Sequence, residues 1–366
     1  LVLAAVGIQP VRSQRDPFVG FEPGAPLFVR QGDRYVTNPV KLCFFNPQEF
    51  PAVKSARAYR IFCLGGSTTY GHPYDHRTYF GSCLRAYLEE TAPDRQWEVV
   101  NCGGISYASY RIALLMDELV RYQPDLFIVY TGHNEFLEER TYGDFRRRNR
   151  MLAGLLRAAS YSRMFQVMQA TLRPAPPEPA SRLPSEVATR LEVVGLEAYH
   201  RDRAWQRAVL EHFRSSLTRI VEQAHGAGAQ VIFVQPAANL KDFTPFKSEH
   251  TAGLSDEQVE RWKGLIVAGR RAQAAGDPQR AVALLREAEQ QNPERAMGLW
   301  YLGDALLAAG QQEDALRYFV RAKDEDVCPL RALSEIGEIL RQVAREQHVT
   351  LVDFPQHLAD QYGVLS

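Results

Sequence analysis

Residues 60–66 read RIFCLGG, a short apolar run that ends in two glycines, and two later stretches repeat this form. They are WEVVNCGG at 97–104 and DLFIVYTGHNE at 125–135. Two more apolar runs occur as AQVIFVQPAAN at 229–239 and VTLVDF at 349–354. Apolar runs of this length, bounded by glycine or polar residues, are typical of strands that are buried on both faces. The sequence therefore predicts five buried strands.

Helical periodicity fills much of the chain between these strands. Amphipathic stretches lie at 80–92, 110–122, 205–228 and 331–347. Strands that alternate with helices favour a parallel sheet with helices on both faces. We therefore expect an α/β protein, a three-layer α/β/α fold of flavodoxin-like type. In such sheets ligands bind at the carboxyl ends of the strands, so a site is to be sought there.

The composition is that of an ordinary globular protein. The 366 residues are 45% hydrophobic and 23% charged, which excludes a disordered chain, a collagen-like fibre and a multi-span membrane protein. Lys plus Arg and Asp plus Glu each number 43, and the zero net charge argues against a nucleic-acid partner. The five cysteines show no CxxC spacing, so we interpret them as buried free thiols.

One segment repeats itself at an interval of 34 residues. The matching pairs are small or apolar: Gly269 and Gly303, Gly276 and Gly310, Ala281 and Ala315, Leu285 and Phe319, and Ala288 and Ala322. Each unit reads as a helix, a turn and a second helix, which resembles tetratricopeptide repeats; coincidental helical hairpins are the alternative. Because two units are fewer than usually stand alone, we expect them to dock on the α/β domain or on the helix at 331–347.

The remaining segments set the expected domain boundaries. The Pro-rich start of the chain predicts short extended pieces and turns, and its first eight residues, LVLAAVGI, are either the end of a membrane anchor or a buried segment. The basic run RRRNR at 146–150 is interpreted as a solvated helix face, with a phosphate or lipid headgroup contact as the alternative. The expected parts are a lead-in at 1–57, an α/β domain at 58–257 with an insertion at about 140–200, two repeats at 258–327, and the last helix and strand at 328–366.

Three successive strand ends carry residues that suit acyl transfer. Ser67 follows the first strand in LGGSTTYG, and Asn134 follows the third in TGHN. After the second strand, in NCGGISYAS, the backbone N–H of Gly103, Gly104 or Ser106 can serve as a donor. A hydroxyl nucleophile, a backbone N–H donor and an amide donor are what this chemistry requires. GGSTT alone would indicate only a turn with a helix cap, but the convergence of three strand ends favours an enzyme site. The segment is neither a GxSxG elbow nor a P-loop.

GGSTT, NCGG and TGHN resemble the first three sequence blocks of the SGNH, or GDSL-like, hydrolase superfamily. The resemblance covers residues 57–140 closely and the other strands loosely. It implies Ser67 as nucleophile, Gly104 or Ser106 as backbone donor to the oxyanion, and Asn134 as side-chain donor. Gly66 stands where the superfamily usually has Asp. The segments LGGSTTYGHPY and VYTGHNEFLEERTYG resemble those of bacterial members of this superfamily that carry tetratricopeptide repeats before the last strand. This resemblance implies a membrane-anchored, periplasmic protein.

The fourth block of this superfamily supplies Asp-x-x-His, the general base and its orienting carboxylate. That spacing does not occur in these 366 residues. We expect the base to lie beyond Ser366, with a protein that lacks the base and is inactive as the alternative. A third option is Asp353 with His357, which are spaced Asp-x-x-x-His at the end of the last strand.

We interpret the other histidines and acidic residues near the site as residues without a catalytic or metal-binding role. His72, Asp75 and His76 lack a clean ligand spacing, which favours a surface position or the rim of a pocket over a metal site. Glu135, with Glu138 and Glu139, reads as the solvated start of a helix. No metal or organic cofactor is implied.

The function predicted from these features is that of a serine esterase or O-acyl(acetyl)transferase with an acyl-enzyme on Ser67. Its substrate is an ester-bearing small molecule, glycan or lipid, and the repeats offer a surface for a protein partner. The rival interpretation is a catalytically inactive scaffold of the same fold whose repeats bind protein in a membrane-associated complex. A sugar-binding module that uses the same cleft is the third.

Overall fold

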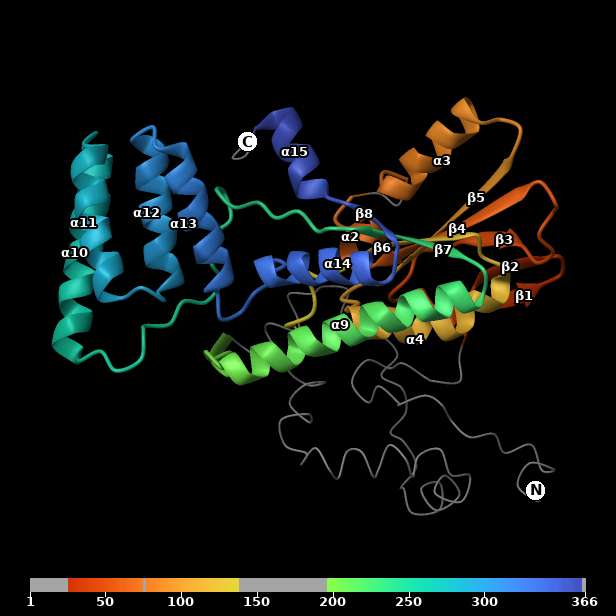
Figure 1. Ribbon diagram of the computed structural model, residues 1–366, viewed down its shortest axis with the longest axis horizontal. Helices are drawn as coiled ribbons and strands as arrows, with labels where there is room; N and C mark the ends of the chain where they lie inside the picture. Colours follow the sequence, from red (N-terminus) through yellow and green to blue (C-terminus); the bar gives the residue numbers. More distant parts are fainter. Residues whose placement is uncertain (1–25, 75–76, 138–195, 364–366) are drawn as a thin grey trace, which may run out of the picture. The chain divides into compact units, whose positions relative to one another are not determined.

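The computed structural model describes residues 26–74, 77–137 and 196–363 (Figure 1). These residues belong to two units, of which one contains 26–54 and the other contains 55–137 and 196–363. The features of the sequence that fall outside the described residues are the apolar run at 1–8, Asp75 and His76, Glu138 and Glu139, and the insertion at 140–195 with its basic run. No helix in the described ranges is long and apolar enough to cross a membrane.

The smaller unit is a three-stranded antiparallel sheet of short strands. Its strands are β1 (Phe28–Gln31), β2 (Arg34–Thr37) and β3 (Glu49–Pro51), with the short 3-10 helix η1 (Pro39–Lys41) between the last two. The rings of Phe28 and Phe50 pack edge to face with their centroids 5.0 Å apart. Short extended pieces are what a segment interrupted by proline is expected to form.

The larger unit contains a five-stranded parallel sheet in the order β5-β4-β6-β7-β8. All five predicted strands are present: β4 (Ala58–Gly65), β5 (Gln96–Gly103), β6 (Leu126–Tyr130), β7 (Gln230–Val234) and β8 (Thr350–Val352). The central strand β6 is buried at every position, as a strand covered on both faces must be. The parallel α/β architecture predicted from the apolar runs is confirmed.

Helices cover both faces of this sheet (Figure 1). One face carries α3 (Phe80–Thr91), whose Phe80, Leu84 and Leu88 pack on a core that includes Ile61 and Val99. The other face carries α4 (Ser109–Leu119), which continues into η2 (Val120–Tyr122), together with α9 (Arg203–Gly226) and α14 (Ser334–Glu346). The short η3 (Leu196–Ala198) precedes α9. The arrangement has the three layers expected from the sequence.

Some local features differ from expectation. Asp353 and His357 were both expected at the end of the last strand, but His357 lies within a helix, α15 (Phe354–Tyr362), that begins directly after β8. Asp353 caps this helix, because its side chain accepts from Gln356 N–H at 3.2 Å. Cys43 and Cys83 are exposed, so the interpretation of all five cysteines as buried holds only for Cys63, Cys102 and Cys328.

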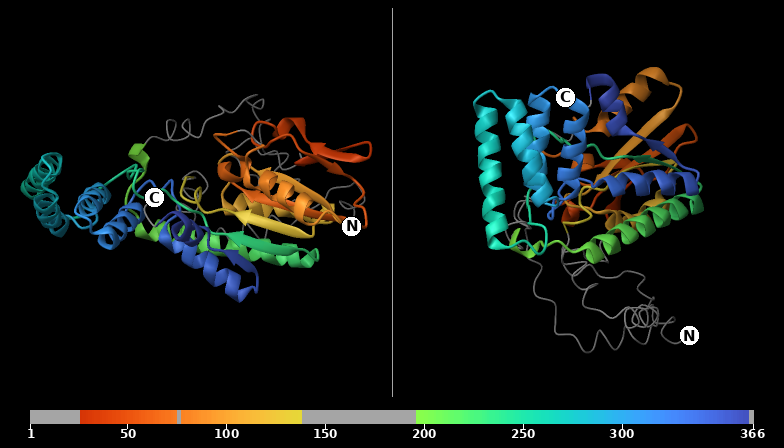
Figure 2. Two further views of the ribbon diagram at one scale, coloured as in Figure 1. Left: turned by 90° about the horizontal axis from the view of Figure 1, so that it is seen from above. Right: turned by 60° about the vertical axis from the view of Figure 1, so that its left-hand side comes forward.

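The 34-residue repeat forms two consecutive helical hairpins (Figure 2). Their helices are α10 (Asp256–Ala274), α11 (Pro278–Gln291), α12 (Ala296–Ala308) and α13 (Gln312–Asp324). A Cβ at Gly269 would lie 2.7 Å from Leu285 Cγ, and a Cβ at Gly303 would lie 3.0 Å from Phe319 Cδ1. These are corresponding pairs of the repeat, and the missing side chains let each pair of helices approach closely. The assignment to tetratricopeptide repeats stays a prediction.

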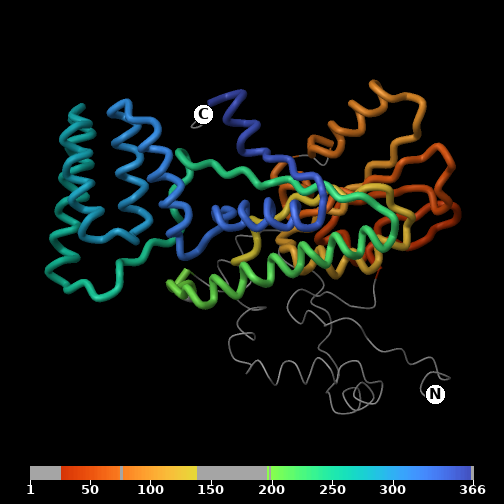
Figure 3. The backbone as a smooth tube through the Cα atoms, in the orientation of Figure 1, coloured from red at the N-terminus to blue at the C-terminus, as the bar shows by residue number. Residues whose placement is uncertain are grey.

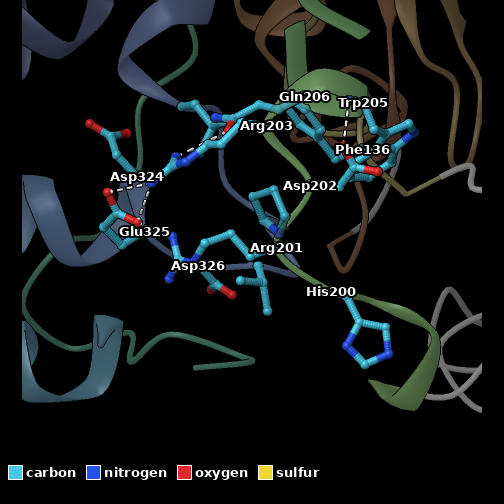
Figure 4. A pocket seen from close by; sticks show the side chains of 13 residues that line it. Phe136, His200, Arg201, Asp202, Arg203, Trp205, Gln206, Asp324, Glu325 and Asp326 are labelled. Carbon is cyan, nitrogen blue, oxygen red and sulfur yellow. Dashed lines mark hydrogen bonds and ion pairs between the residues drawn. The ribbon is translucent and has the colours of Figure 1, made fainter. Parts of the chain in front are cut away.

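The hairpins are anchored where the chain returns to the sheet (Figure 3). Lys323 at the end of α13 is buried and donates to Ala332 O at 2.9 Å, while Asp324 accepts from Ser334 N–H at 2.9 Å at the start of α14. On the other side Arg201 and Arg203 both pair with Glu325. A small, solvent-open hollow lies at this junction, where Figure 4 shows the Arg203–Glu325 pair. The end of the second hairpin is therefore tied to the start of the helix that follows it.

We expect Gly269→Ala to lower the free energy of unfolding by about 1–3 kcal/mol, because the new methyl group overlaps Leu285. Gly264 lies on the same helix, is exposed, and has open space at its Cβ position. Gly264→Ala should therefore raise the free energy of unfolding by about 0.5–1 kcal/mol. Urea denaturation of both variants measures whether the free energy of unfolding falls or rises relative to the wild type. A stabilising Gly269→Ala would contradict the close packing of α10 on α11.

Candidate active site

Ser67 lies at the point where the sheet changes its winding direction. The connection from β4 to β5 runs through α3 on one face, and the connection from β5 to β6 runs through α4 on the other face. β4 lies between β5 and β6, so the carboxyl ends of β4 and β6 form a topological switch point. Ser67 follows β4 there and Asn134 follows β6. Switch points of this kind are where open α/β sheets bind ligands.

The nucleophile candidate is presented by a very short turn. Gly65 ends β4, Gly66 is in extended conformation, and Ser67 begins the four-residue helix α2 (Ser67–Tyr70). Ser67 is partly exposed, and its hydroxyl makes no hydrogen bond within the part of the chain that the structure describes. A serine held at a strand end in this way can meet a substrate without any rearrangement of the sheet.

The amide of Asn134 lies against the backbone beside Ser67. A Cβ at Gly66 would lie 2.4 Å from Asn134 Nδ2, so no residue with a side chain fits at position 66 while the amide stays in place. This contact is a physical reason for glycine at position 66. Asn134 is 9% exposed, and its Nδ2 donates to Tyr107 O at 3.0 Å. An amide nitrogen has two hydrogens, and the second is available to a ligand.

Gly104 N–H, the first choice from the sequence for a backbone donor to the oxyanion, already has a partner in the structure. Gly104 N–H donates to Gly65 O at 3.0 Å, so this group is used within the sheet. The next residues form a turn that Tyr107 N–H closes on Gly104 O at 3.1 Å, with Ser106 in the left-handed region at φ 60°. The N–H groups of Ile105 and Ser106 make no hydrogen bond to any described residue. Of the two backbone donors that the family resemblance implies, Gly104 N–H is already used, whereas Ser106 N–H has no partner among the described residues.

His133, the residue before Asn134, uses its Nδ1 atom in a backbone contact, so this atom cannot act as a base. Its Nδ1 accepts from Ala332 N–H at 3.1 Å, so this nitrogen carries no proton and the proton of the neutral ring is on Nε2. Burial, together with the nearby Lys323 ammonium, lowers the pKa of His133 to about 4. The imidazole is therefore neutral at pH 7 and ties the Asn134 loop to the segment before α14.

We expect the pH dependence of stability to report this burial. From pH 6.5 downward the unfolded chain takes up a proton at His133, while the folded protein does so only near pH 4. The free energy of unfolding should thus fall across this window, by at most roughly 3 kcal/mol. His133→Gln should remove the fall, so the difference between wild type and variant shrinks from pH 7 to pH 4.5.

The variant is needed because Asp326 acts in the opposite direction. Burial raises the pKa of this carboxyl from 3.8 to about 6, so the folded protein binds its proton first and gains stability as the pH drops through the same range. Chemical denaturation of both proteins at each pH separates the two groups. A difference between wild type and His133→Gln that does not change with pH would contradict the assignment.

Glu135 is not the solvated residue that the sequence indicated. Its side chain is 0% exposed, and its carboxylate accepts from Ser109 N–H at 2.9 Å and from Ser109 Oγ at 2.8 Å. The acidic cluster suggested a helix start in water, whereas the residue serves the N-terminus of α4, far away in sequence. In the sequence, the apolar Phe136 directly after Glu135 was a local indication that this segment is buried, and Phe136 is buried in the structure.

Asp353 and His357 follow β8, the strand farthest from β4 in the order of the sheet. β8 is an edge strand that lies three strands from β4, a separation of about 14 Å between the strands. The Asp353 carboxylate caps α15 and lies 3.5 Å from Arg341 Nη2, while His357 is exposed on that helix. Within the described ranges no three His, Cys, Asp or Glu side chains are grouped as a metal site requires.

The chain matches no family model and no curated protein in sequence. Among solved structures it is similar to an acetyl xylan esterase, with a TM-score of 0.32 and 10% identity over 82% of this chain and 80% of that chain. An acetyl-xylooligosaccharide esterase from Geobacillus stearothermophilus gives 0.31 and 10%, over 82% and 78%. A gut microbial diltiazem-metabolizing enzyme gives 0.32 and 10%, over 86% of this chain and 42% of that chain.

Proposed function

We propose that the chain is a serine esterase or O-acyltransferase of SGNH type, with Ser67 as its nucleophile. The observation that carries the proposal is the contact between the Asn134 amide and the Gly66 backbone at the switch point of the sheet. This contact supports the proposal because Gly66 directly precedes Ser67 in the chain, so the amide donor lies next to the residue before the proposed nucleophile. Donors placed where negative charge develops are the largest single contribution to many acyl-transfer reactions.

In the proposed reaction Ser67 Oγ attacks the carbonyl carbon of an ester and loses its proton to a base. The carbonyl oxygen becomes an oxyanion that accepts from the free hydrogen of Asn134 Nδ2 and from Ser106 N–H. The intermediate collapses to an acyl-enzyme and releases the alcohol, which takes up a proton. Water then removes the acyl group as an acid, or a sugar hydroxyl accepts it as a new ester.

The substrates proposed are neutral esters, such as an acetylated glycan, a lipid or a small ester. The helical hairpins α10–α13 are proposed to offer a surface to a protein partner, and the chain is proposed to act at a bacterial membrane on its periplasmic side. These assignments rest on the resemblance of LGGSTTYGHPY and of the 34-residue repeat.

One observation favours a second candidate. Among the described residues no imidazole is hydrogen-bonded to the Ser67 hydroxyl, which a serine nucleophile needs for activation. On this observation the alternative is an inactive scaffold of the same fold, which uses its helical hairpins to bind another protein in a membrane-associated complex.

A fluorophosphonate probe separates the two candidates, because it reacts only with an activated serine. We expect labelling of the wild-type protein and hydrolysis of p-nitrophenyl acetate between pH 6 and 9. A folded protein that neither takes the label nor hydrolyses the ester at any of these pH values would reject the enzyme and support the scaffold.

A further inference from the structure

The carboxylate of Glu135 is buried directly beside the proposed oxyanion donor. Besides its two contacts with Ser109, it accepts from Thr131 Oγ1 at 3.3 Å. A carboxylate is strongly disfavoured in a protein interior unless hydrogen bonds satisfy it. An apolar side chain would fill the same space without this requirement, so the position has a purpose besides packing.

The contacts of Glu135 join two segments that meet only in the folded chain. Ser109 begins α4, and Ala108, which precedes it, has no side chain that can cap the helix. The Glu135 carboxylate takes over that role from the end of β6, where it also lies favourably in the field of the helix N-terminus. The turn at 104–108 and the loop at 131–137 are thereby held together.

The same two segments are joined a second time by the proposed site. Asn134 Nδ2 donates to Tyr107 O at 3.0 Å, one residue before Glu135 and two before Ser109. The two connections run side by side, so a shift of the loop that breaks one strains the other. Phe136 adds a third anchor, since its ring packs on Trp205 with the centroids 5.7 Å apart.

We infer that Glu135 is a positioning residue that acts through Asn134, an inference that rests on the proposed function for its catalytic consequence. Its carboxylate keeps the loop seated on α4, so that the free hydrogen of Asn134 Nδ2 points into the proposed site beside Ser67. A displacement of about 1 Å in such a group lowers a rate by up to about a hundredfold.

Glu135→Gln tests this with little change in shape. The variant keeps one acceptor oxygen but directs an NH₂ group at a Ser109 donor. We expect kcat for p-nitrophenyl acetate, and the rate of fluorophosphonate labelling, to fall about ten- to a hundredfold with KM within about twofold, because the oxyanion forms only in the transition state. Ser109→Ala, which removes only one partner, should show a smaller fall of the same kind. A raised KM with unchanged kcat would overturn the inference.

Asn134→Ala and a matched buried glutamate separate positioning from a general loss of stability. If Glu135 acts through Asn134, adding Glu135→Gln to Asn134→Ala causes no further loss, whereas independent effects would multiply and overturn the inference. Glu98 is also buried but pairs with Arg60 at 2.6 Å, at the amino-terminal edge of the sheet. Glu98→Gln should destabilise the protein and leave the rate per folded molecule unchanged.

A measurement that needs no activity distinguishes this inference from the proposed function. We expect amide hydrogen exchange in peptides covering 104–112 and 131–137 to accelerate at least about tenfold in Glu135→Gln and to stay unchanged there in Glu98→Gln. Unchanged exchange in Glu135→Gln would overturn the inference even in an active enzyme. If exchange accelerates in Glu135→Gln but the wild-type protein has no esterase activity, the proposed function is rejected and the structural role of Glu135 stands.

Discussion

Ser67→Ala is expected to abolish fluorophosphonate labelling and to lower the hydrolysis of p-nitrophenyl acetate by at least about a thousandfold. The probe forms a bond between its phosphorus and Ser67 Oγ, and alanine has no atom that replaces this oxygen. The substitution should leave folding intact, because the Ser67 hydroxyl makes no hydrogen bond within the described ranges and the residue is only partly buried. Mass spectrometry of the labelled protein locates the modified residue.

Thr68→Ala is the matched control for this variant. Thr68 is the next residue on α2, carries an exposed hydroxyl and lies on the same turn. We expect Thr68→Ala to be labelled at the wild-type rate. Labelling that persists in Ser67→Ala, or that disappears equally in Thr68→Ala, would show that Ser67 is not the nucleophile.

Asn134→Ala should lower kcat by about a hundred- to a thousandfold and leave KM almost unchanged. The amide contributes to the oxyanion and not to the neutral ester, so its loss is felt in the transition state. Asn134→Asp should be at least as harmful, because a carboxylate oxygen replaces the donor and repels the oxyanion. Steady-state kinetics and the rate of fluorophosphonate labelling give the two quantities.

Stability has to be measured with Asn134→Ala, because the variant also removes the hydrogen bond that Asn134 Nδ2 donates to Tyr107 O. Loss of a buried hydrogen bond costs about 1–3 kcal/mol. Asn292 is a control with a comparable loss: it is buried in the helical hairpins, where its Oδ1 accepts from Thr251 N–H at 2.9 Å. Asn292→Ala should lower the free energy of unfolding and retain full labelling. Wild-type labelling of Asn134→Ala would exclude Asn134 as the oxyanion donor.

The strands and hairpins could be predicted because their signals are local. An apolar run such as the one that became β6 marks a strand without knowledge of its neighbours, and a 34-residue period places Gly269 and Gly303 at equivalent points of two helices. The contact of Gly269 with Leu285 follows from the repeat itself, since both residues belong to one hairpin. Ser67 and Asn134 could be found for the same reason, as polar residues at strand ends.

The partners of the site residues could not be predicted in this way. Gly104 N–H was the first choice for an oxyanion donor, but it donates to Gly65 O on the neighbouring strand. Asp353 and His357 formed an acceptable pair on spacing alone, and the order of the strands keeps them three positions from β4. Each of these outcomes depends on which strand lies beside which, and periodicity carries no information about that.

The sequence alone thus established the parallel α/β architecture, the helical repeat, and the identity of Ser67 and Asn134 as candidates, since these follow from apolar patterning and from residues adjacent in the chain. The folded chain was needed to show that the Asn134 amide excludes any side chain at position 66, that no described residue accepts from Ser106 N–H, and that Glu135 is buried. The physical reason is that a hydrogen bond or a desolvated charge is a property of two segments in contact. Glu135 and Ser109 lie 26 positions apart and meet only after the sheet has formed.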